Sequence, residues 1–315
     1  MVNLSKAECS ISSWYPIFVK DSLDTEILPI PEDVLKYLES DPFILPVEVT
    51  DNKISHLKWE DGSSVNDDSQ DDSEAQPTFP EFSKKIQDVI DDFGAVFIKS
   101  NWRTPSDAIW VTATKTLKCT SLEDIYLLLK SSNKIARDIT VAKELLDDTK
   151  IQSCLVLKKW RDINPSTEFR CFVIKKELVG ICQRDVSQYH QYIENEKYNI
   201  QTDIISLFRE RIKNRFKLDN YSFDVIRYKK DKVKIIDFGL LDESATKGTL
   251  FTYSELHNSI TNPPEFRFIA EDMGIQPNTS NHFIVPREIN EFFSSNDPDS
   301  MIDMIRRAVE NQQIE

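Results

Sequence analysis

Residues 221–241, YSFDVIRYKKDKVKIIDFGLL, predict two β-strands joined by the polar turn KKDK, and this hairpin decides the fold class. If the hairpin turns symmetrically at 230–231, Asp224 lies directly opposite Asp237 and both side chains share one face of the sheet. A register shifted by one residue would place the two acids on opposite faces. We favour the facing arrangement, because nothing nearby in the sequence offers Asp237 a simpler role.

Two carboxylates that face each other across a strand ladder destabilise it, by a few tenths to about 1 kcal/mol. A divalent cation shared by Asp224 and Asp237 would reverse that sign, and hard oxygen ligands suit Mg²⁺. The neighbours Phe223, Val225 and Phe238 are apolar, so both acids belong to partly buried strands. The hairpin therefore predicts a magnesium site, and the alternative is an exposed acid near a strand end.

Asp237, Phe238 and Gly239 also spell the metal-binding triplet of protein kinases, but the rest of the kinase pattern is missing. The chain has 6 glycines, and none of their spacings forms a glycine-rich phosphate loop. None of the 4 histidines is followed by arginine, and no Ala-Pro-Glu follows the triplet. The kinase class is therefore excluded.

A second hairpin is expected at 168–186, EFRCFVIKKELVGICQRDV. If it turns at 176–177, Glu168 faces Asp185 and Arg170 faces Gln183, all on one face. Arg170 then either belongs to a surface ladder of ion pairs or binds phosphate oxygens in a bidentate manner. The second role requires its face to meet the pair of acids in the first hairpin.

Lysines end two further predicted strands: Lys99 ends AVFIK, and Lys158 and Lys159 lie near the end of CLVLKKW. A lysine at the end of a strand is either simply solvated or a point charge for phosphate. Two such strands, one arginine and two facing acids together describe a Mg-nucleotide cleft between two lobes.

The order of the elements indicates an α+β protein in two lobes with mostly antiparallel sheets. We expect an N-terminal segment at 1–60 that packs on the lobes, an acidic mobile loop at 61–78, lobes at 79–150 and 151–290, and a C-terminal helix within 291–315. Besides the two hairpins, helices are expected at 79–94, 121–132, 138–149, 201–216 and 298–313, and strands at 95–100, 109–114 and 154–160.

Composition limits the classes of partner. The chain has 315 residues and a net charge of −14, and such a surface repels nucleic acid and suits a basic protein partner, or serves solubility alone. Its 5 cysteines form no close pairs, which indicates free thiols in a reducing compartment, and we expect a cytoplasmic protein. No apolar run is long enough for a membrane span, and zinc is not expected.

Six motifs are spread over most of the chain: WYPIF (14–18), NWRTPSDAIWV (101–111), LKCTSLEDIYLLLKSS (117–132), EFRCFV (168–173), GICQRD (180–185) and IIDF (235–238). Together they resemble the eukaryotic cell division cycle protein 123 family. The resemblance implies an ATP-grasp fold, in which two α+β lobes hold Mg-ATP between them. It also implies a role as assembly chaperone of eukaryotic translation initiation factor two, through the gamma subunit, in support of translation initiation and cell-cycle progression.

The resemblance implies ATP and Mg²⁺ as cofactors, and it implies roles for particular residues. Asp224 and Asp237 would hold the metal. The end of a strand at Lys159 and Trp160 would lie beside adenine. The residues implied to contact the nucleotide are Lys99, Trp102, Lys158, Lys159, Trp160, Arg170, Asp185 and Asp224.

The sequence departs from the family at one position of the metal site. The family usually has Asp-Phe-Asn-Pro where this chain has Asp237, Phe238, Gly239 and Leu240. Glycine offers no side-chain oxygen, so water, bidentate binding by Asp237, or a nearby acid such as Asp242 or Glu243 would have to replace the asparagine.

Three functions are open at this stage. The first is a monomeric, ATP-using assembly chaperone that binds the gamma subunit, with no assigned catalytic residue and no membrane or nucleic-acid partner. The second is an ATP-grasp ligase that forms an acyl-phosphate on a protein or small carboxylate substrate, which would need positive charge at an acceptor site. The third is a scaffold with a degenerate nucleotide site.

Overall fold

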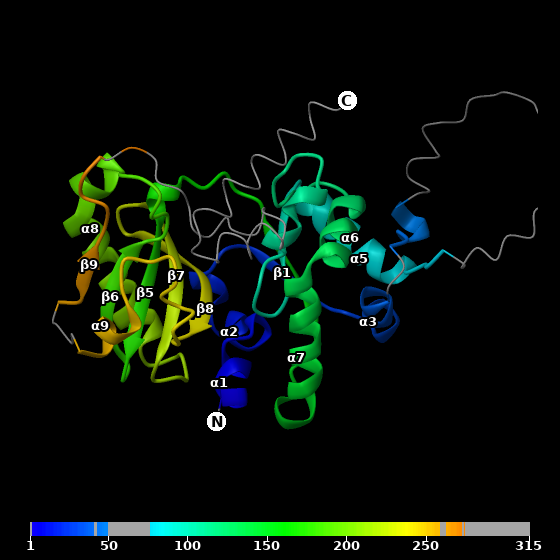
Figure 1. The fold of residues 1–315 in the computed structure, drawn as a ribbon, viewed down its shortest axis with the longest axis horizontal. Helices are drawn as coiled ribbons and strands as arrows, with labels where there is room; N and C mark the ends of the chain where they lie inside the picture. Colours follow the sequence, from blue (N-terminus) through cyan, green and yellow to red (C-terminus); the bar gives the residue numbers. More distant parts are fainter. Residues whose placement is uncertain (1, 41–42, 50–75, 259–262, 273, 275–315) are drawn as a thin grey trace, which may run out of the picture. The chain divides into compact units, whose positions relative to one another are not determined.

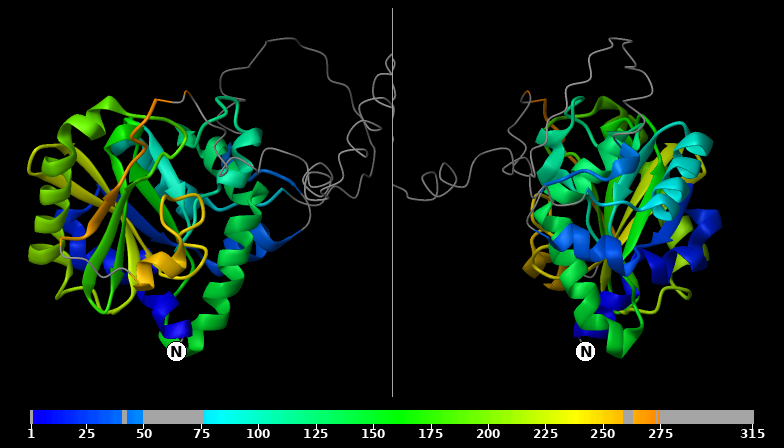
Figure 2. Two further views of the ribbon diagram at one scale, coloured as in Figure 1. Left: turned by 60° about the vertical axis from the view of Figure 1, so that its left-hand side comes forward. Right: turned by 90° about the vertical axis from the view of Figure 1, so that its right-hand side faces the viewer.

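The computed structural model describes residues 2–40, 43–49, 76–258, 263–272 and 274, and Figures 1 and 2 show their course. Residues 61–75 of the expected acidic loop and the expected helix 298–313 lie outside these residues. No described helix has the length and apolar character that crossing a membrane requires. The helices are α1 Val2–Glu8, α2 Ile11–Phe18, α3 Glu32–Glu39, α5 Pro80–Phe93, α6 Leu122–Ser131, α7 Asn133–Thr149, α8 Gln191–Leu207 and α9 Tyr253–Asn258, with 3-10 turns η1 Val19–Asp21, η2 Ser106–Val111 and η3 Pro165–Thr167 and a π-helical turn η4 Phe208–Ile212.

The first sheet has the order β1-β4-β2-β3 with antiparallel neighbours throughout. Its strands are β1 Thr25–Pro29, β2 Val96–Lys99, β3 Lys118–Cys119 and β4 Cys154–Lys159. Ile98, Leu155 and Leu157 lie in a core with apolar residues of α3, α5 and α6. Because side chains alternate along a strand, Lys99 and Lys158 point to the opposite face. β1 and β4 come from outside the range 79–150, so the first sheet joins segments that lie far apart in the sequence.

The second sheet has the order β8-β7-β5-β6-β9, and only the β6–β9 pair is parallel. Its strands are β5 Glu168–Ile174, β6 Glu177–Gln183, β7 Tyr221–Lys229, β8 Lys232–Leu240 and β9 Glu265–Arg267, and Figure 1 shows β5 to β8 side by side. Phe169, Val225 and Phe238 point into a core shared with α2 and α8. The opposite face carries Arg170 and Asp224, and on it Phe172 packs with Phe251.

Several local predictions are confirmed. α5 ends at Gly94, whose φ of +77° suits glycine. The Ser121 side chain accepts a hydrogen bond from the Asp124 backbone N–H and caps α6, as the sequence pattern predicts.

Three local predictions are wrong, namely one strand and the starts of two helices. Residues 109–114 do not form a strand; they belong largely to η2 and the turn after it, where Thr112 N–H donates to the Ile109 carbonyl. α7 begins at Asn133, not 138, because the Ser132 side chain caps it. α8 begins at Gln191, not 201, because its buried stripe already starts at Ile193.

The two hairpins differ in how well their registers were predicted. Asp224 pairs with Asp237, which confirms the register of the first hairpin. In the other hairpin Arg170 pairs with Cys182, not with Gln183, so that predicted register is wrong by one residue and Glu168 does not face Asp185. The turn falls at Lys175 and Lys176, both with positive φ, and a bulge after Phe172 then shifts the ladder again.

An aromatic cluster holds β8 in place from behind the two acids. The Phe238 ring stacks on Phe216 with centroids 4.2 Å apart and contacts Trp14 and Phe18 of α2 at 5.2 Å and 5.3 Å. Since Phe238 and Asp237 are adjacent in a strand, burying the ring directs the carboxylate to the opposite face.

We expect Phe238→Ala to lower the free energy of unfolding by about 3–5 kcal/mol, because removing a buried ring leaves a cavity. Phe43, whose side chain is 53% exposed, supplies the matched control, and Phe43→Ala should change stability by no more than about 0.5 kcal/mol. Urea unfolding followed by tryptophan fluorescence measures both. Similar losses for the two variants would contradict the importance of the cluster.

Candidate functional site

Three charged side chains form one row across neighbouring strands of the second sheet. Arg170 of β5 pairs with Asp224 of β7, and Asp224 pairs with Asp237 of β8. Direct cross-strand partners point to the same face, so the row presents one positive and two negative groups side by side. The positive charge of Arg170 explains in part why the fold tolerates two facing acids.

Arg170 neutralises Asp224 through a bidentate ion pair. Its Nε and Nη2 lie 2.7 Å from the two carboxylate oxygens, and its Nη1 donates to the Ala245 carbonyl at 3.1 Å. Burial acts to raise the pKa of the Asp224 carboxyl, but the charge and hydrogen bonds of Arg170 outweigh it and hold that pKa below its ordinary value. Asp224 is therefore a carboxylate whose two oxygens are both engaged.

Asp237 is neutralised from the other sheet. Lys99 Nζ at the end of β2 lies 2.5 Å from Asp237 Oδ2. Lys158 of β4 reaches across as well, and its Nζ donates to the Ile236 carbonyl. A bulge between Asp224 and Val225 leaves Ile236 as the extra residue of β8. Two lysines of the first sheet thus bind the β8 strand of the second.

The remaining oxygen of Asp237 gives the test of a metal role. Asp237 Oδ1 is buried and has no hydrogen-bond partner among the described residues. The described part of the chain contains no group of three or more His, Cys, Asp or Glu side chains that could hold a metal ion. Mg²⁺ in nucleotide sites is usually held by one or two carboxylates, with phosphate oxygens and water completing its coordination. Asp237 and Asp224 fit that requirement.

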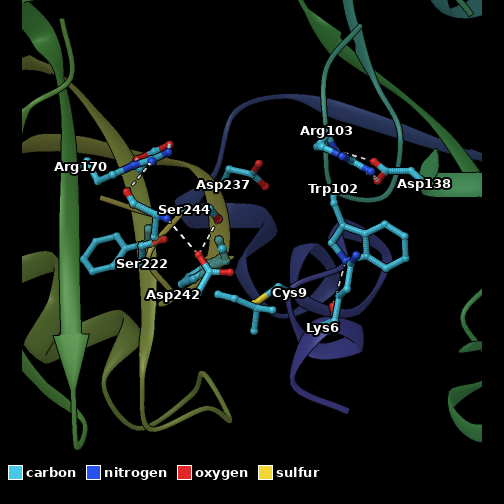
Figure 3. A pocket seen from close by; sticks show the side chains of 16 residues that line it. Lys6, Cys9, Trp102, Arg103, Asp138, Arg170, Ser222, Asp237, Asp242 and Ser244 are labelled. Carbon is cyan, nitrogen blue, oxygen red and sulfur yellow. Dashed lines mark hydrogen bonds and ion pairs between the residues drawn. The ribbon is translucent and has the colours of Figure 1, made fainter. Parts of the chain in front are cut away.

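Two cavities, each of about 360 Å³, meet at this row. Figure 3 shows the first, with Arg170, Ser222, Asp237 and Asp242 on one side and Trp102 and Arg103 on the other. The second extends to Lys99, Lys158 and Glu168. The residues common to both linings are Trp102, Arg103, Arg170, Asp224 and Asp237.

The second cavity is positive although the protein is acidic. Its lining contains 6 basic and 3 acidic side chains, in a chain whose net charge is −14. Such an excess of positive charge attracts a polyanion and strengthens its binding. The basic residues are Lys99, Arg103, Lys134, Lys158, Arg170 and Arg184, and the acidic ones are Glu168, Asp224 and Asp237.

Most of the predicted site residues meet in the two cavities, but three do not line either of them. Lys159 follows Lys158 in β4, so its side chain points to the other face, where its Nζ lies 5.5 Å from the centroid of the Phe93 ring. The Trp160 indole donates to Asp162, and the Asp185 carboxylate pairs with His190 at 3.2 Å and accepts from Ser187.

Sequence reasoning missed several lining residues. Arg103 forms an ion pair with the buried Asp138 of α7, and Arg184 Nε lies 3.9 Å from Asp224 Oδ2. Lys6 and Cys9 of the N-terminal segment line the first cavity. Arg184 is part of the quoted GICQRD motif and could have been chosen from it, but no spacing in the sequence brings Lys6 or Asp138 to the site.

Gly239 lies opposite Ser222 and lines the first cavity. A Cβ at this position would lie 3.0 Å from the Ser222 hydroxyl oxygen, so a larger residue would need Ser222 to shift. Of the two acids considered as substitutes for the family asparagine, Asp242 lines the first cavity and Glu243 lines neither cavity. Asp242 Oδ1 accepts hydrogen bonds within its own loop from Ser244 and Ala245.

The fold and the site define an α+β protein with a charged cleft between two mostly antiparallel sheets. A family model described as D123 matches residues 14–293 of the chain. The chain therefore belongs to the D123 family.

Named relatives and solved structures agree with this assignment. The translation initiation factor eIF2 assembly protein of Xenopus laevis is 33% identical over 325 residues, which cover 95% of this chain and 94% of the relative. Cell division cycle protein 123 of Yarrowia lipolytica is 37% identical over 265 residues, or 82% of this chain and 69% of the relative. The structure of Cdc123 from Schizosaccharomyces pombe matches with a TM-score of 0.66 at 32% identity, covering 85% of this chain and 98% of that one. The predicted family and α+β fold class are confirmed.

Lys158 gives the site a pH-dependent stability. Its side chain is 5% exposed, and burial together with the charge of Lys99 lowers the pKa of Lys158 to about 7. The unfolded chain takes up this proton as the pH falls below its ordinary pKa of 10.5, whereas the folded protein takes it up only near 7. The folded state therefore loses stability as the pH falls from about 10 to about 7.

We expect Lys158→Met to stabilise the protein, least at pH 10 and most at pH 7 and below, because methionine needs no proton in either state. The matched control is Lys159→Met, the same change at the neighbouring residue, whose side chain faces away from the cleft toward the Phe93 ring. Thermal unfolding at a series of pH values measures both. A gain for Lys158→Met that does not change with pH would contradict the burial of a neutral lysine.

Proposed function

We propose that this protein is a Mg-ATP-binding assembly chaperone of translation initiation factor eIF2 and that it binds the gamma subunit. The observation that carries the proposal is the positive cavity that meets two facing carboxylates in an otherwise acidic protein. Membership of a family whose relatives are named eIF2 assembly proteins supplies the partner. The resemblance seen in the sequence supplies ATP, the gamma subunit and the ATP-grasp architecture.

In this proposal the second cavity holds the phosphates. Lys99, Lys158 and Arg170 contact phosphate oxygens, and Trp102 and Arg184 also line this cavity. Asp237 holds Mg²⁺ through its unpartnered Oδ1, and Asp224 is the second carboxylate; the metal, when bound, neutralises part of the phosphate charge. Nucleotide contacts by Lys159, Trp160 and Asp185 rest on the resemblance alone.

The net charge of −14 supports docking to a basic surface of the partner, without nucleic acid. We place the protein in the cytoplasm as a monomer, where eIF2 subunits would meet it. ATP acts here as a bound ligand, and no side chain is assigned to catalysis.

The metal role is tested by calorimetry of Mg-ATP binding. We expect Asp237→Asn to weaken binding at least about tenfold, because the amide removes a charged metal ligand without changing its size. The control is Asp231→Asn in the turn of the same hairpin, where φ is +58° and asparagine is well tolerated. Equal affinities for Asp237→Asn and the wild type would refute the metal role.

The partner is tested by affinity purification with the gamma subunit. We expect retention of the gamma subunit to fall as salt rises from about 0.05 to 0.5 M, because screening weakens attraction between oppositely charged surfaces. Retention of the gamma subunit that does not change with salt concentration would contradict an acidic docking surface. No retention of the gamma subunit at any salt concentration would contradict the proposed partner.

A further inference from the structure

The charged groups that a nucleotide and its metal would need are already paired with one another in the site. Lys99 is bound to Asp237, and Arg170 is bound to Asp224. These contacts are partly shielded from water, since the Lys99 side chain is 2% exposed, those of Arg170 and Asp224 are 17% exposed each, and that of Asp237 is 26% exposed. Each of the two basic side chains is thus the partner of one carboxylate, and each carboxylate is the partner of one basic side chain.

A metal ion arriving alone would bind at a cost. To use both carboxylates it must displace Arg170 from Asp224, whose two oxygens are both occupied. At Asp237 the metal can approach the unpartnered Oδ1, but it competes with Lys99 for the negative charge of the carboxylate. The released cations would then remain near the metal in a partly buried cavity, together with Lys158. Removing one partner of a buried ion pair leaves an uncompensated charge, which is strongly unfavourable.

A polyanion arriving alone faces the reverse problem. To bind Lys99 and Arg170 it must draw them away from their carboxylates. Asp224 and Asp237 are directly opposite in the ladder, so they would then repel both each other and the polyanion. Lys99 and Arg170 are therefore available to the polyanion only if something else neutralises these two acids.

We propose that the site selects the metal complex of a polyphosphate and discriminates against either component alone, because the Lys99–Asp237 and Arg170–Asp224 ion pairs exchange partners together. The polyphosphate takes over the two bases and the metal takes over the two acids, so no charge is left unpaired. This proposal rests on the function proposed above and specifies its ligand. Metal and polyphosphate are then positively coupled ligands.

The two ion pairs do not contribute equally to this coupling. Arg170 is held by both oxygens of Asp224 and by the Ala245 carbonyl, so that pair is the harder one to separate. Lys99 makes one contact with Asp237, whose second oxygen is buried without a partner among the described residues. Lys99 and Asp237 are therefore the residues that set the coupling.

The first arm of the test measures ATP affinity by calorimetry, with excess Mg²⁺ and with EDTA. We expect wild-type protein to bind ATP at least about fiftyfold more weakly in EDTA, within the range usual for coupled sites. Asp237→Asn frees Lys99, so in EDTA it should bind ATP at least about fivefold more tightly than the wild type. Its affinity should respond little to Mg²⁺.

The matched control for this arm is Glu168→Gln. Glu168 lines the same cavity, but no hydrogen bond or ion pair of its side chain is found in the described part of the chain, so the change removes a charge without freeing a base. It should therefore strengthen metal-free ATP binding less than Asp237→Asn does, and it should leave the dependence on Mg²⁺ in place.

The second arm uses Lys99→Met and measures Mn²⁺ binding without nucleotide by electron paramagnetic resonance. The variant leaves Asp237 unpaired, so we expect it to bind Mn²⁺ at least about fivefold more tightly than the wild type. Thermal unfolding confirms that each variant is folded. The two variants thus shift affinity toward opposite ligands, which a general loss of structure would not do.

The outcomes separate the two proposals. Equal wild-type ATP affinity in Mg²⁺ and in EDTA, or equal shifts for Asp237→Asn and Glu168→Gln, would overturn the exchange of partners while leaving nucleotide binding intact. No ATP binding by the folded wild-type protein under either condition would overturn the proposed function, and the exchange with it.

Discussion

The structure of the site depends on one constraint, namely that Asp224 and Asp237 lie opposite each other on adjacent strands. Two like charges in this position are unfavourable unless each is neutralised. The chain neutralises them from two directions, with Arg170 in the next strand and with Lys99 from the other sheet. The requirement for a counter-charge therefore links the two sheets as well as shaping the cleft.

The same constraint explains why the opposite face of the hairpin carries an aromatic residue next to Asp237. A carboxylate stays on the cleft face only if the residue beside it is anchored on the other, and Phe238 provides that anchor among Trp14, Phe18 and Phe216. The N-terminal helices are thus part of the support of the site, and α1 also contributes Lys6 to the wall of the first cavity. Packing and electrostatics act here on the two sides of one strand.

The sequence predicted those features that depend on local alternation. The facing of Asp224 and Asp237 followed from a single hairpin with a polar turn, and the structure confirms it. The register of β5 and β6 did not follow, because a bulge and a turn displaced by one residue leave no simple trace in an alternating pattern. Lys158 and Lys159 show the same limit. They are adjacent in β4, so the side chain of one points into the cleft and that of the other points to the opposite face. The contributions of Lys6 and Asp138 depend on contacts far apart in sequence, and no local pattern reports them.

The aromatic contact between α2 and β8 has a consequence for how the chain folds during synthesis. Trp14 and Phe18 are made early, but their partner Phe238 lies close to the other end of the described chain. Contacts between residues so far apart in sequence form late, because the intervening loop must be closed first. Until then the two rings lack this partner on the ribosome-bound chain, and exposed apolar surface of this kind promotes aggregation. A protein whose relatives are named for assembling another factor would, for that interval, itself be open to binding by a general chaperone.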